Sequence, residues 1–326
     1  MKAVWFERNG PAEVMQVGEM PEPDPGPGEV RIRVITSGVN PSDWKRRLGT
    51  TAPMAFPRVI PHQDGAGVID HVGEGVPASR LGERVWLFES QFGRPFGSAA
   101  EYTVQPSDHA VRMPDSITYE QGACLGVPAM TAHRCLFADG PVEGMVVLVP
   151  GGAGAVGNYA VQEAKLAGAT VISTVSSDHK AEIAAAAGAD HIINYRTEDV
   201  TARIMDLTGG EGVDRIVEVD FAANFPVTSQ VLKSNGVVAI YSWGVIQQPP
   251  VPLQFRRSNT VVRNVLVYEM PASAKEAAIA DITAWLEAGS LTHLIGSHFP
   301  LEETVAAHLA VEGGAIGNVI VDVGDE

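Results

Sequence analysis

Cysteine is scarce in this sequence, which contains only Cys124 and Cys135. Two cysteines exclude a disulfide-built scaffold and a four-cysteine zinc site. Long apolar runs are also missing, and a membrane-spanning helix needs about 20 consecutive apolar residues. Charged residues come early, at Glu7 and Arg8, so we expect no signal peptide, no membrane partner and a cytoplasmic location.

Basic residues are few as well. The chain has 23 Lys and Arg against 39 Asp and Glu, which gives a formal net charge of −16. Proteins that bind nucleic acid need a basic surface, so this balance argues against a nucleic-acid partner. With 326 residues, 45% hydrophobic and 19% charged, the sequence is typical of a globular protein with two domains.

The first third of the chain is predicted to be rich in β-strands. Apolar and charged residues alternate over Val30–Ile35, as in a strand with one buried face. The preceding stretch, Pro21–Gly28, is dominated by proline and glycine and is predicted to be a loop. Further strands are expected at Gly65–Gly73 and Arg84–Phe88, and this domain is expected to end near Gly122.

From Glu120 onward, helices and strands alternate, which is typical of a parallel sheet with crossover helices. The tail Ile320–Val323 is predicted to be a strand that rejoins the first domain. The expected strands are Val146–Val149, Thr170–Val175, Ile192–Ile193, Ile216–Val219, Val237–Ile240 and Val261–Tyr268, and the expected helices are Asn158–Gly168, Lys180–Ala187 and Ala277–Ala288.

A glycine motif lies between the first of these strands and the first helix. Gly152–Gly157 has the pattern G-x-G-x-x-G in strand–turn–helix context, which indicates a dinucleotide-binding turn. One glycine permits a tight turn, one permits the backbone to approach a pyrophosphate, and one permits close helix–sheet packing. The helix N-terminus then binds the phosphates. The alternative is a glycine-rich turn that only packs tightly.

The end of the second strand bears on which dinucleotide is bound. NAD-binding domains place an acid there, about 20 residues after the motif, to bind the ribose hydroxyls. This sequence has Val175 at that position, followed by the hydroxyls of Ser176 and Ser177 and the cation of Lys180. Such groups favour a 2′-phosphate and therefore NADPH. The alternative is a solvated Lys180 in a helix whose N-cap is Asp178.

Several further stretches form an ordered series along the chain: Gly38–Asp43, Gly65–Ile69, Leu81–Val85, Cys124–Ala132, Gly188–Arg196, Leu232–Val238 and Gly313–Ile320. This series resembles the zinc-free quinone oxidoreductases of the zeta-crystallin type, in the medium-chain dehydrogenase/reductase superfamily. The resemblance implies an α/β fold with a Rossmann cofactor domain at 123–269 and a β-rich, chaperonin-10-like (GroES-like) catalytic domain at 1–122 and 270–326. It also implies a homodimer formed through the last cofactor-domain strand.

Zinc-dependent members of the resembled superfamily carry a cysteine where Asn40 stands and a His–Glu pair where Gln63 and Asp64 stand. An amide replaces neither a thiolate nor an imidazole as a zinc ligand. His62 lies one position from the ligand site, and we interpret it as a loop histidine with local hydrogen bonds. We therefore expect no metal site and a reduction driven by NADPH.

The resemblance also implies positions for the cofactor-binding residues. The pyrophosphate would contact Gly154, Ala155, Val156 and Gly157, and the 2′-phosphate would contact Ser176, Ser177, Lys180 and Tyr195. The nicotinamide would be bordered by Thr131, Tyr241, Ser242, Trp243, Gly244, Leu266, Val267 and Tyr268. Gly317 and Asn318 would close the cleft from the catalytic domain.

Asn40, Asp43 and Lys45 would line the substrate end. Asn40 is either an amide donor to a developing oxyanion or a turn residue before Pro41, and Asp43 is either catalytic or structural. Many quinone oxidoreductases carry a tyrosine where this chain has Lys45, so that role does not transfer. Lys45 could attract a substrate oxygen, although Lys45–Arg47 is also expected to be a solvated basic turn. His133 is interpreted as packed rather than catalytic.

These observations predict an NADPH-dependent quinone oxidoreductase with a small-molecule quinone or enone substrate. One alternative is a reductase of alkenal, enone or enoyl-thioester double bonds, for which no carrier-binding basic patch is evident beyond Lys45–Arg47. An alternative of another class is a non-catalytic, crystallin-like NADPH-binding protein. Turnover of a quinone, as opposed to NADPH binding alone, separates these interpretations.

Overall fold

The computed structural model describes residues 1–244 and 258–325. By their contacts these residues divide into two compact units. The first unit comprises residues 1–127, 281–289 and 293–325, and the second comprises residues 128–244, 258–280 and 290–292. These are contact units, so the predicted folding-domain boundaries at 122/123 and 269/270 stay a prediction.

The first unit is built on a seven-stranded sheet with the order β14-β15-β3-β4-β5-β7, in which β6 also pairs with β3. A separate hairpin pairs β1 with β2. The strands are β1 Lys2–Trp5, β2 Gln16–Glu19, β3 Glu29–Val39, β4 Asp64–Val72, β5 Arg84–Leu87, β6 Tyr102–Pro106, β7 Ala110–Arg112, β14 Ile295–Pro300 and β15 Asn318–Asp322. The predicted strands in the first third are therefore confirmed, as is the loop at 21–28.

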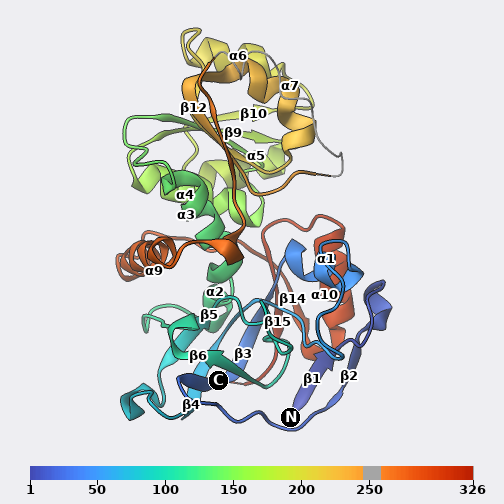
Figure 1. Cartoon of the computed structure of the whole chain (residues 1–326). Helices are drawn as coiled ribbons and strands as arrows, with labels where there is room; N and C mark the ends of the chain where they lie inside the picture. The colour runs from blue at the N-terminus through green and yellow to red at the C-terminus, as the bar shows by residue number, and fades with distance from the viewer. Residues whose placement is uncertain (245–257, 326) are drawn as a thin grey trace. The chain divides into compact units, whose positions relative to one another are not determined.

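Strand β3 shows why this sheet forms. Val30, Ile32 and Val34 are buried, while the arginines between them are half-buried, so one face of the strand enters the core. Strand β15 pairs antiparallel with β3, Val319 opposite Val39. Figure 1 shows the red end of the chain beside the blue strand of the first third. The prediction that the tail rejoins the first domain's strands is confirmed.

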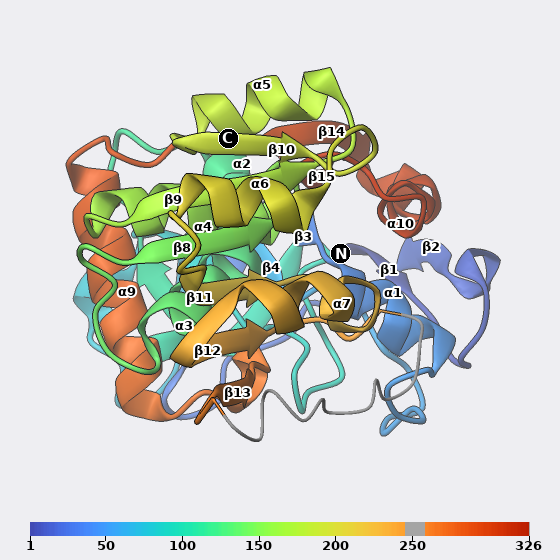
Figure 2. The same ribbon diagram turned by 90° about the horizontal axis from the view of Figure 1, so that it is seen from above.

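The second unit is built on a six-stranded parallel sheet with the order β10-β9-β8-β11-β12-β13. Figure 2 shows these strands following one another in this order. The order reverses between β8 and β11, a switch point where open α/β sheets bind ligands. The strands are β8 Val146–Pro150, β9 Thr170–Val175, β10 His191–Asn194, β11 Val213–Glu218, β12 Leu232–Ile240 and β13 Val261–Asn264.

The helices that connect these strands are α4 Ala155–Leu166, α5 Asp178–Ala186, α6 Val200–Leu207 and α7 Phe221–Val231, with α3 Met130–Phe137 ahead of β8. Apolar side chains from the strands and from α6 and α7 form one buried cluster, which includes Leu148, Ile172, Ile204 and Phe225. The predicted alternation of helix and strand is confirmed for this unit.

Several predicted elements have different bounds, among them β12, which begins at Leu232 instead of Val237, and α4, which begins at Ala155 instead of Asn158. The strand expected over Val261–Tyr268 ends at Asn264, because the Leu266 carbonyl accepts the Glu269 amide at 3.0 Å and starts the helical turn η5 Val267–Glu269. The helix expected over Ala277–Ala288 is α9 Ala272–Glu287. It starts earlier because the Ala274 amide already bonds the Pro271 carbonyl, at 2.9 Å.

Some elements were not predicted at all. The helices α1 Pro41–Leu48, α2 Tyr119–Gly122 and α10 Thr304–Glu312 and the π-helical turn Leu125–Ala129 belong to this group. Helix α1 matters most for the site, because it carries Asp43 and Lys45 and follows Asn40 directly. None of the helices in the described residues is long and apolar enough to cross a membrane.

Candidate active site

The turn after β8 is built by glycines. The Gly151 backbone has φ of +76°, a conformation that glycine adopts readily, and its amide bonds the Thr174 carbonyl at 2.9 Å. The Gly154 amide bonds back to the Gly151 carbonyl at 2.9 Å, and Gly154 is the N-cap of α4. The chain therefore reverses within one tight turn. Gly151 lies just outside the predicted motif, and the strand end at Pro150 was the signal that could have found it.

Gly152 and Gly157 permit close packing. A Cβ at Gly157 would lie 2.2 Å from the Gly151 carbonyl oxygen, and a Cβ at Gly152 would lie 2.3 Å from Ser173 Oγ. The N-cap Gly154 has no side chain to cover the helix end. Because the first amides of a helix have no intrahelical partner, those of Ala155 and Val156 are available to an anion.

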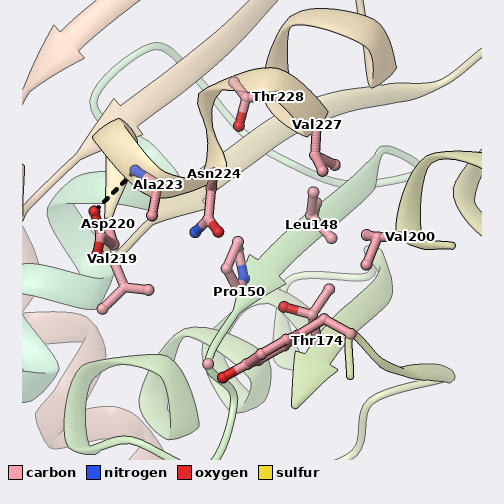
Figure 3. Close-up of a pocket in the computed structure, with 12 residues that line it drawn as sticks. Leu148, Pro150, Thr174, Val200, Val219, Asp220, Ala223, Asn224, Val227 and Thr228 are labelled. Atoms are coloured by element: carbon pink, nitrogen blue, oxygen red, sulfur yellow. Dashed lines mark hydrogen bonds between the residues drawn. The ribbon is translucent and has the colours of Figure 1, made fainter. Parts of the chain in front are cut away.

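A pocket of about 420 Å³ lies at the carboxyl ends of β8, β9 and β11 in the second unit. Figure 3 shows Asn224 directed from α7 toward Pro150, with Leu148 and Val200 beside them. Pro150, Gly151 and Thr174 form one side, and Val219 and Asp220 the other. The pocket therefore lies at the switch point of the sheet, next to the glycine turn.

The end of β9 bears no carboxylate. Val175, which stands at the acid position of NAD-binding domains, is buried with 2% exposure. Ser177 is the N-cap of α5, and its Oγ accepts the Lys180 amide at 3.3 Å. The alternative that Asp178 caps this helix is therefore wrong, since Asp178 is the first helical residue. Lys180 makes no salt bridge with any residue in the described parts of the chain.

Tyr195 lies beside this strand end. Its amide donates to the Val175 carbonyl at 3.0 Å, which continues the parallel pairing of β10 with β9. Its side chain is exposed and also lines the 420 Å³ pocket. The structure therefore brings Ser176, Ser177 and Tyr195 to one edge of the sheet.

The predicted nicotinamide-side residues follow β12 and β13. Trp243 Nε1 donates to Asn264 Oδ1 at 3.0 Å, and its ring meets Phe221 edge to face, with centroids 5.3 Å apart. Gly244 has φ of +69°, and a Cβ there would lie 2.0 Å from Asp220 Oδ1. The remaining members of the group lie nearby in the second unit: Tyr241 and Ser242 after β12, Leu266, Val267 and Tyr268 after β13, and buried Thr131 on α3.

In the first unit, Asn40 is the N-cap of α1, and its backbone N–H donates to Asp43 Oδ2 at 2.7 Å. The Asn40 side-chain Nδ2 donates to Asp64 Oδ2 at 2.8 Å. Both Asp64 oxygens also accept the Val127 amide, at 2.9 Å. Asn40 thus has the turn role that was one of its two predicted roles, and Asp43 has a structural one. The carboxyl of Asp64 is a member of this cluster that the sequence did not suggest.

Burial controls the protonation of this cluster. The pKa of Asp43 is raised from 3.8 to about 7 by desolvation, against the opposing effect of the Asn40 amide. The pKa of Asp64 is raised well above 3.8 by desolvation, which outweighs its hydrogen bonds from Val127 and Asn40. Asp43 therefore exchanges its proton near neutrality, close to Asn40.

Each residue at a zinc-ligand position already has a hydrogen-bond partner: Asn40 and Asp64 bond each other, and Gln63 bonds Gln91. Gln63 Nε2 donates to Gln91 Oε1 at 3.2 Å, and Gln63 Oε1 accepts the backbone N–H of Gln91, also at 3.2 Å. Within residues 1–244 and 258–325, no group of three or more His, Cys, Asp or Glu is arranged to hold a metal ion.

His62 is buried and has two hydrogen-bond partners. Its Nδ1 lies 2.8 Å from Ser37 Oγ, and its Nε2 lies 3.0 Å from His308 Nε2. The interpretation of His62 as a loop histidine with local hydrogen bonds is wrong about the partners, because Ser37 and His308 lie 25 and 246 residues away in the sequence. Burial lowers the pKa of His62 to about 3 and lowers that of His308 well below 6.5. Both rings are therefore neutral at pH 7.

The expectation of a solvated basic turn at Lys45–Arg47 is wrong for Arg47. Its side chain is fully buried and bonds Glu312, the Gly10 carbonyl at 2.8 Å and His308 Nδ1 at 3.4 Å. The physical reason is helix α1, which turns Asp43 and Arg47, four positions apart, toward the interior. Lys45 stays half-buried, with Nζ 5.6 Å from the centre of the Trp44 ring.

Two further predicted residues are engaged locally. Asn318 Nδ2 donates to the Leu294 carbonyl at 3.0 Å, and Gly317 beside it has φ of +72°. His133 is buried against Phe137, with ring centroids 4.6 Å apart, so its interpretation as a packed residue is confirmed.

Comparison with known proteins bears on the identity of this site. The model for the alcohol dehydrogenase GroES-like domain matches residues 26–115, and the model for the zinc-binding dehydrogenase matches residues 155–284. The human quinone oxidoreductase is 30% identical over 321 residues, which cover 97% of this chain and 95% of that protein. This chain belongs to the quinone oxidoreductase family. The family lies within the medium-chain dehydrogenase/reductase superfamily, and the chain is an oxidoreductase with a GroES-like and a Rossmann-like domain.

Other members of this superfamily are similar along the whole chain. A 2-haloacrylate reductase from Burkholderia is 30% identical over 336 residues, which cover 98% of both proteins. A crystal structure of an NAD-dependent alcohol dehydrogenase has a TM-score of 0.91 and 28% identity, covering 99% of this chain and 100% of the other. A mycobacterial protein solved in complex with NADPH has a TM-score of 0.88 and 27% identity, covering 98% and 99%.

Proposed function

We propose that this quinone oxidoreductase family member reduces quinones and similar conjugated carbonyl compounds with NADPH and without zinc. The observation that carries the proposal is the glycine turn from Gly151 to Gly157, followed at the end of β9 by serines and a lysine in place of an acid. This arrangement suits a dinucleotide with a 2′-phosphate.

In this proposal the pyrophosphate binds at Gly154–Gly157, and the 2′-phosphate binds Ser176, Ser177, Lys180 and Tyr195. The adenine occupies the 420 Å³ pocket, whose lining is mostly apolar. The nicotinamide is bordered by Thr131 and by the residues after β12 and β13, and Gly317 and Asn318 complete the cofactor site. NADPH, when bound, supplies the hydride.

The substrate end is proposed to be formed by Asn40, Asp43 and Lys45. Asn40 has an amide where a zinc-binding relative has a thiolate, and that amide is already bonded to Asp64. Because amides are poor zinc ligands, the donors at this position do not fit a zinc ion. Asp43 positions Asn40 through its backbone amide and, with a pKa of about 7, buffers a proton beside it.

The test follows NADPH absorbance with purified protein and offers 1,4-benzoquinone, 9,10-phenanthrenequinone and a simple alkenone in parallel. Oxidation of NADPH with the quinones, faster than with the alkenone, is the expected result. NADPH binding without any turnover would instead favour a non-catalytic cofactor-binding protein.

Double-bond reduction is the second candidate. The observation that favours it is the 2-haloacrylate reductase relative, which aligns over nearly the whole chain. A clear preference for the alkenone over both quinones in the same assay would select this candidate.

We also propose a cytoplasmic homodimer with folding domains at 1–122 plus 270–326 and at 123–269. The dimer would pair through β13, which lies at the edge of the described sheet and exposes 39% of Val261 and 40% of Val262. An exposed edge strand of this kind is a template for pairing with a second chain. Analytical ultracentrifugation tests it, and the variant Val262→Lys should shift the protein toward monomer.

A further inference from the structure

The first unit contains a second cavity that the proposed function does not use. It has a volume of about 270 Å³ and lies between α1 and the chain from Ala52 to Val59. Its walls are largely apolar, with Phe6, Met54 and Phe56 among them, and its polar members are Arg46 and Gln91. We call this cavity the Arg46 pocket.

Arg46, Arg8 and Arg112 are the arginines of this unit whose side chains make no salt bridge and no hydrogen bond with any residue in the described ranges. Of these three, Arg46 is the one that lines the 270 Å³ pocket, and its guanidinium lies 5.6 Å from the centre of the Phe92 ring. The protein has a net charge of −16, and carboxylates are plentiful. The paired arginines are Arg31 with Asp70, Arg47 with Glu312, Arg58 with Glu7, Arg80 with Glu83 and Arg94 with Glu29.

Gln91, the other polar wall of the pocket, already has a partner at both its side-chain oxygen and its side-chain nitrogen. Its Oε1 accepts Gln63 Nε2 at 3.2 Å, and its Nε2 donates to the Arg94 carbonyl at 2.8 Å. The guanidinium of Arg46 is therefore the wall group that is available to a ligand, in a cavity that otherwise suits a small apolar group. Arginine binds carboxylates through two parallel hydrogen bonds.

The pocket adjoins the proposed substrate end. Arg46 lies one helical turn after Asp43 on α1, and its charge acts on the Asp43 carboxyl. Gln91 joins the pocket to Gln63, the neighbour of Asp64 in the buried cluster. A ligand held by Arg46 would thus be anchored beside the residues assigned to the substrate.

We propose that the Arg46 pocket binds the carboxylate of a small α,β-unsaturated acid and that such acids are acceptors for this enzyme. The inference rests on the proposed function, because it names a substrate class for the same reductase. In the reaction the β-carbon gains a hydride, the α-carbon gains a proton from water, and the C=C π bond is lost. NADPH becomes NADP⁺, and the carboxylate is unchanged.

The experiment compares the wild-type protein with the Arg46→Met variant on 2-chloroacrylate and on its uncharged methyl ester. A charge-assisted pair between Arg46 and the acid should be lost in the variant. We expect kcat/KM for the acid to fall at least tenfold, kcat/KM for the ester to change less than twofold, and Arg46→Lys to retain part of the preference for the acid.

Binding without turnover gives a second readout. Isothermal titration calorimetry with the saturated acid 2-chloropropionate should show a Kd that is at least tenfold higher for Arg46→Met than for the wild type. Arg33→Met is the matched control, because Arg33 also belongs to the first unit but bonds the Asp325 carbonyl, at 2.7 Å, outside the pocket. The control should leave both measurements unchanged.

Equal losses with the acid and the ester, or an unchanged Kd for 2-chloropropionate in Arg46→Met, would overturn the inference. Quinone turnover by a wild-type protein that neither reduces nor binds the acids overturns the inference and leaves the proposed function standing. A protein that reduces no acceptor but binds 2-chloropropionate through Arg46 refutes the proposed function and keeps the pocket.

Discussion

The candidate site residues are held by backbone contacts in the second unit and by side-chain hydrogen bonds in the first unit. In the second unit the glycine turn is made of backbone from one short segment, and its closing hydrogen bond, from the Gly154 amide to the Gly151 carbonyl, joins residues three positions apart. In the first unit helix α1 is held at both ends by side chains from distant parts of the chain: Asp64 bonds Asn40 at its start, and Glu312 and His308 bond Arg47 in its last turn. A backbone-built site leaves a local pattern in the sequence, whereas a side-chain-built site does not.

The largest effect is expected from Arg47→Met in the first unit. Removing the buried guanidinium leaves Glu312, whose side chain is 27% exposed, and His308 Nδ1 without this partner. Because the remaining carboxylate is partly solvated, we expect a cost near the lower end of the range for a broken buried pair, about 3 kcal/mol. Urea unfolding should show this loss in the free energy of unfolding. The control is Arg46→Met, one position away, which should change it by less than about 0.5 kcal/mol. Equal effects would erase the distinction between the two arginines.

The buried histidines give the next largest effect, as a dependence of stability on pH. His62 has a folded pKa of about 3, and an unfolded histidine titrates near 6.5, so the unfolded chain binds the extra proton between these values. Stability therefore falls as the pH falls through this window, by about 1.4 kcal/mol per pH unit for this residue. The variant His62→Gln should show a smaller slope between pH 6.5 and pH 4.5.

Asp43 acts in the opposite direction. Its folded pKa of about 7 lies above the unfolded value of 3.8, so the folded protein binds the extra proton and this contribution weakens as the pH rises from about 4 to 7. Asp43→Asn should therefore steepen the loss of stability on acidification. Chemical unfolding at several pH values measures how the free energy of unfolding changes with pH. Equal slopes for the wild type, His62→Gln and Asp43→Asn would contradict this assignment.

In the second unit, Gly157→Ala tests the backbone-built site. A Cβ would lie 2.2 Å from the Gly151 carbonyl oxygen, so the turn must shift. We expect the Kd for NADPH to rise about 30-fold, which corresponds to about 2 kcal/mol. Fluorescence titration measures it, and far-ultraviolet circular dichroism confirms that the variant is folded. An unchanged Kd would show that the phosphates bind elsewhere.

The smallest effect is expected from Lys180→Ala. Loss of one cation at the 2′-phosphate should raise the KM for NADPH about tenfold and change the KM for NADH less than twofold. Lys233→Ala serves as the control, because Lys233 pairs with Asp214 at 3.0 Å in the same unit. Equal effects of Lys180→Ala on both cofactors would refute the phosphate assignment.

Sequence alone predicted the second unit almost strand by strand, because apolar runs such as Val147–Val149 are buried whole and glycines such as Gly168 end the helices. It missed helix α1, whose charged residues show no apolar face. The buried side of α1 is formed by Asp43 and Arg47, and the partner His308 of Arg47 lies 261 residues away. A local sequence pattern does not predict a contact between residues this far apart.

In the candidate site, too, residues next to a strand end were predicted from the sequence, and residues held by distant side chains were not. Ser177 was predicted to be near the phosphate because it follows a strand end, and the structure adds its role as a helix cap. Asp64 was noted in the sequence only because it stands where zinc-dependent relatives carry a glutamate. Its hydrogen bonds to Asn40 and Val127 join residues 24 and 63 positions apart, so no local pattern predicts them. Burial of the Asp64 carboxyl follows from that packing.

The pairing of β15 with β3 has a consequence for synthesis of the chain. The strand Glu29–Val39 leaves the ribosome long before its partner Asn318–Asp322 is made. The two are separated by roughly 280 residues, which at about 5–20 residues per second corresponds to tens of seconds of translation. During that interval the nascent first third exposes an unpaired strand edge, while the parallel sheet of the second unit, contiguous from β8 to β13, can already form. Because an unpaired strand edge is a template for pairing with another chain, the first third is the part of the nascent protein that is exposed to mispairing for longest.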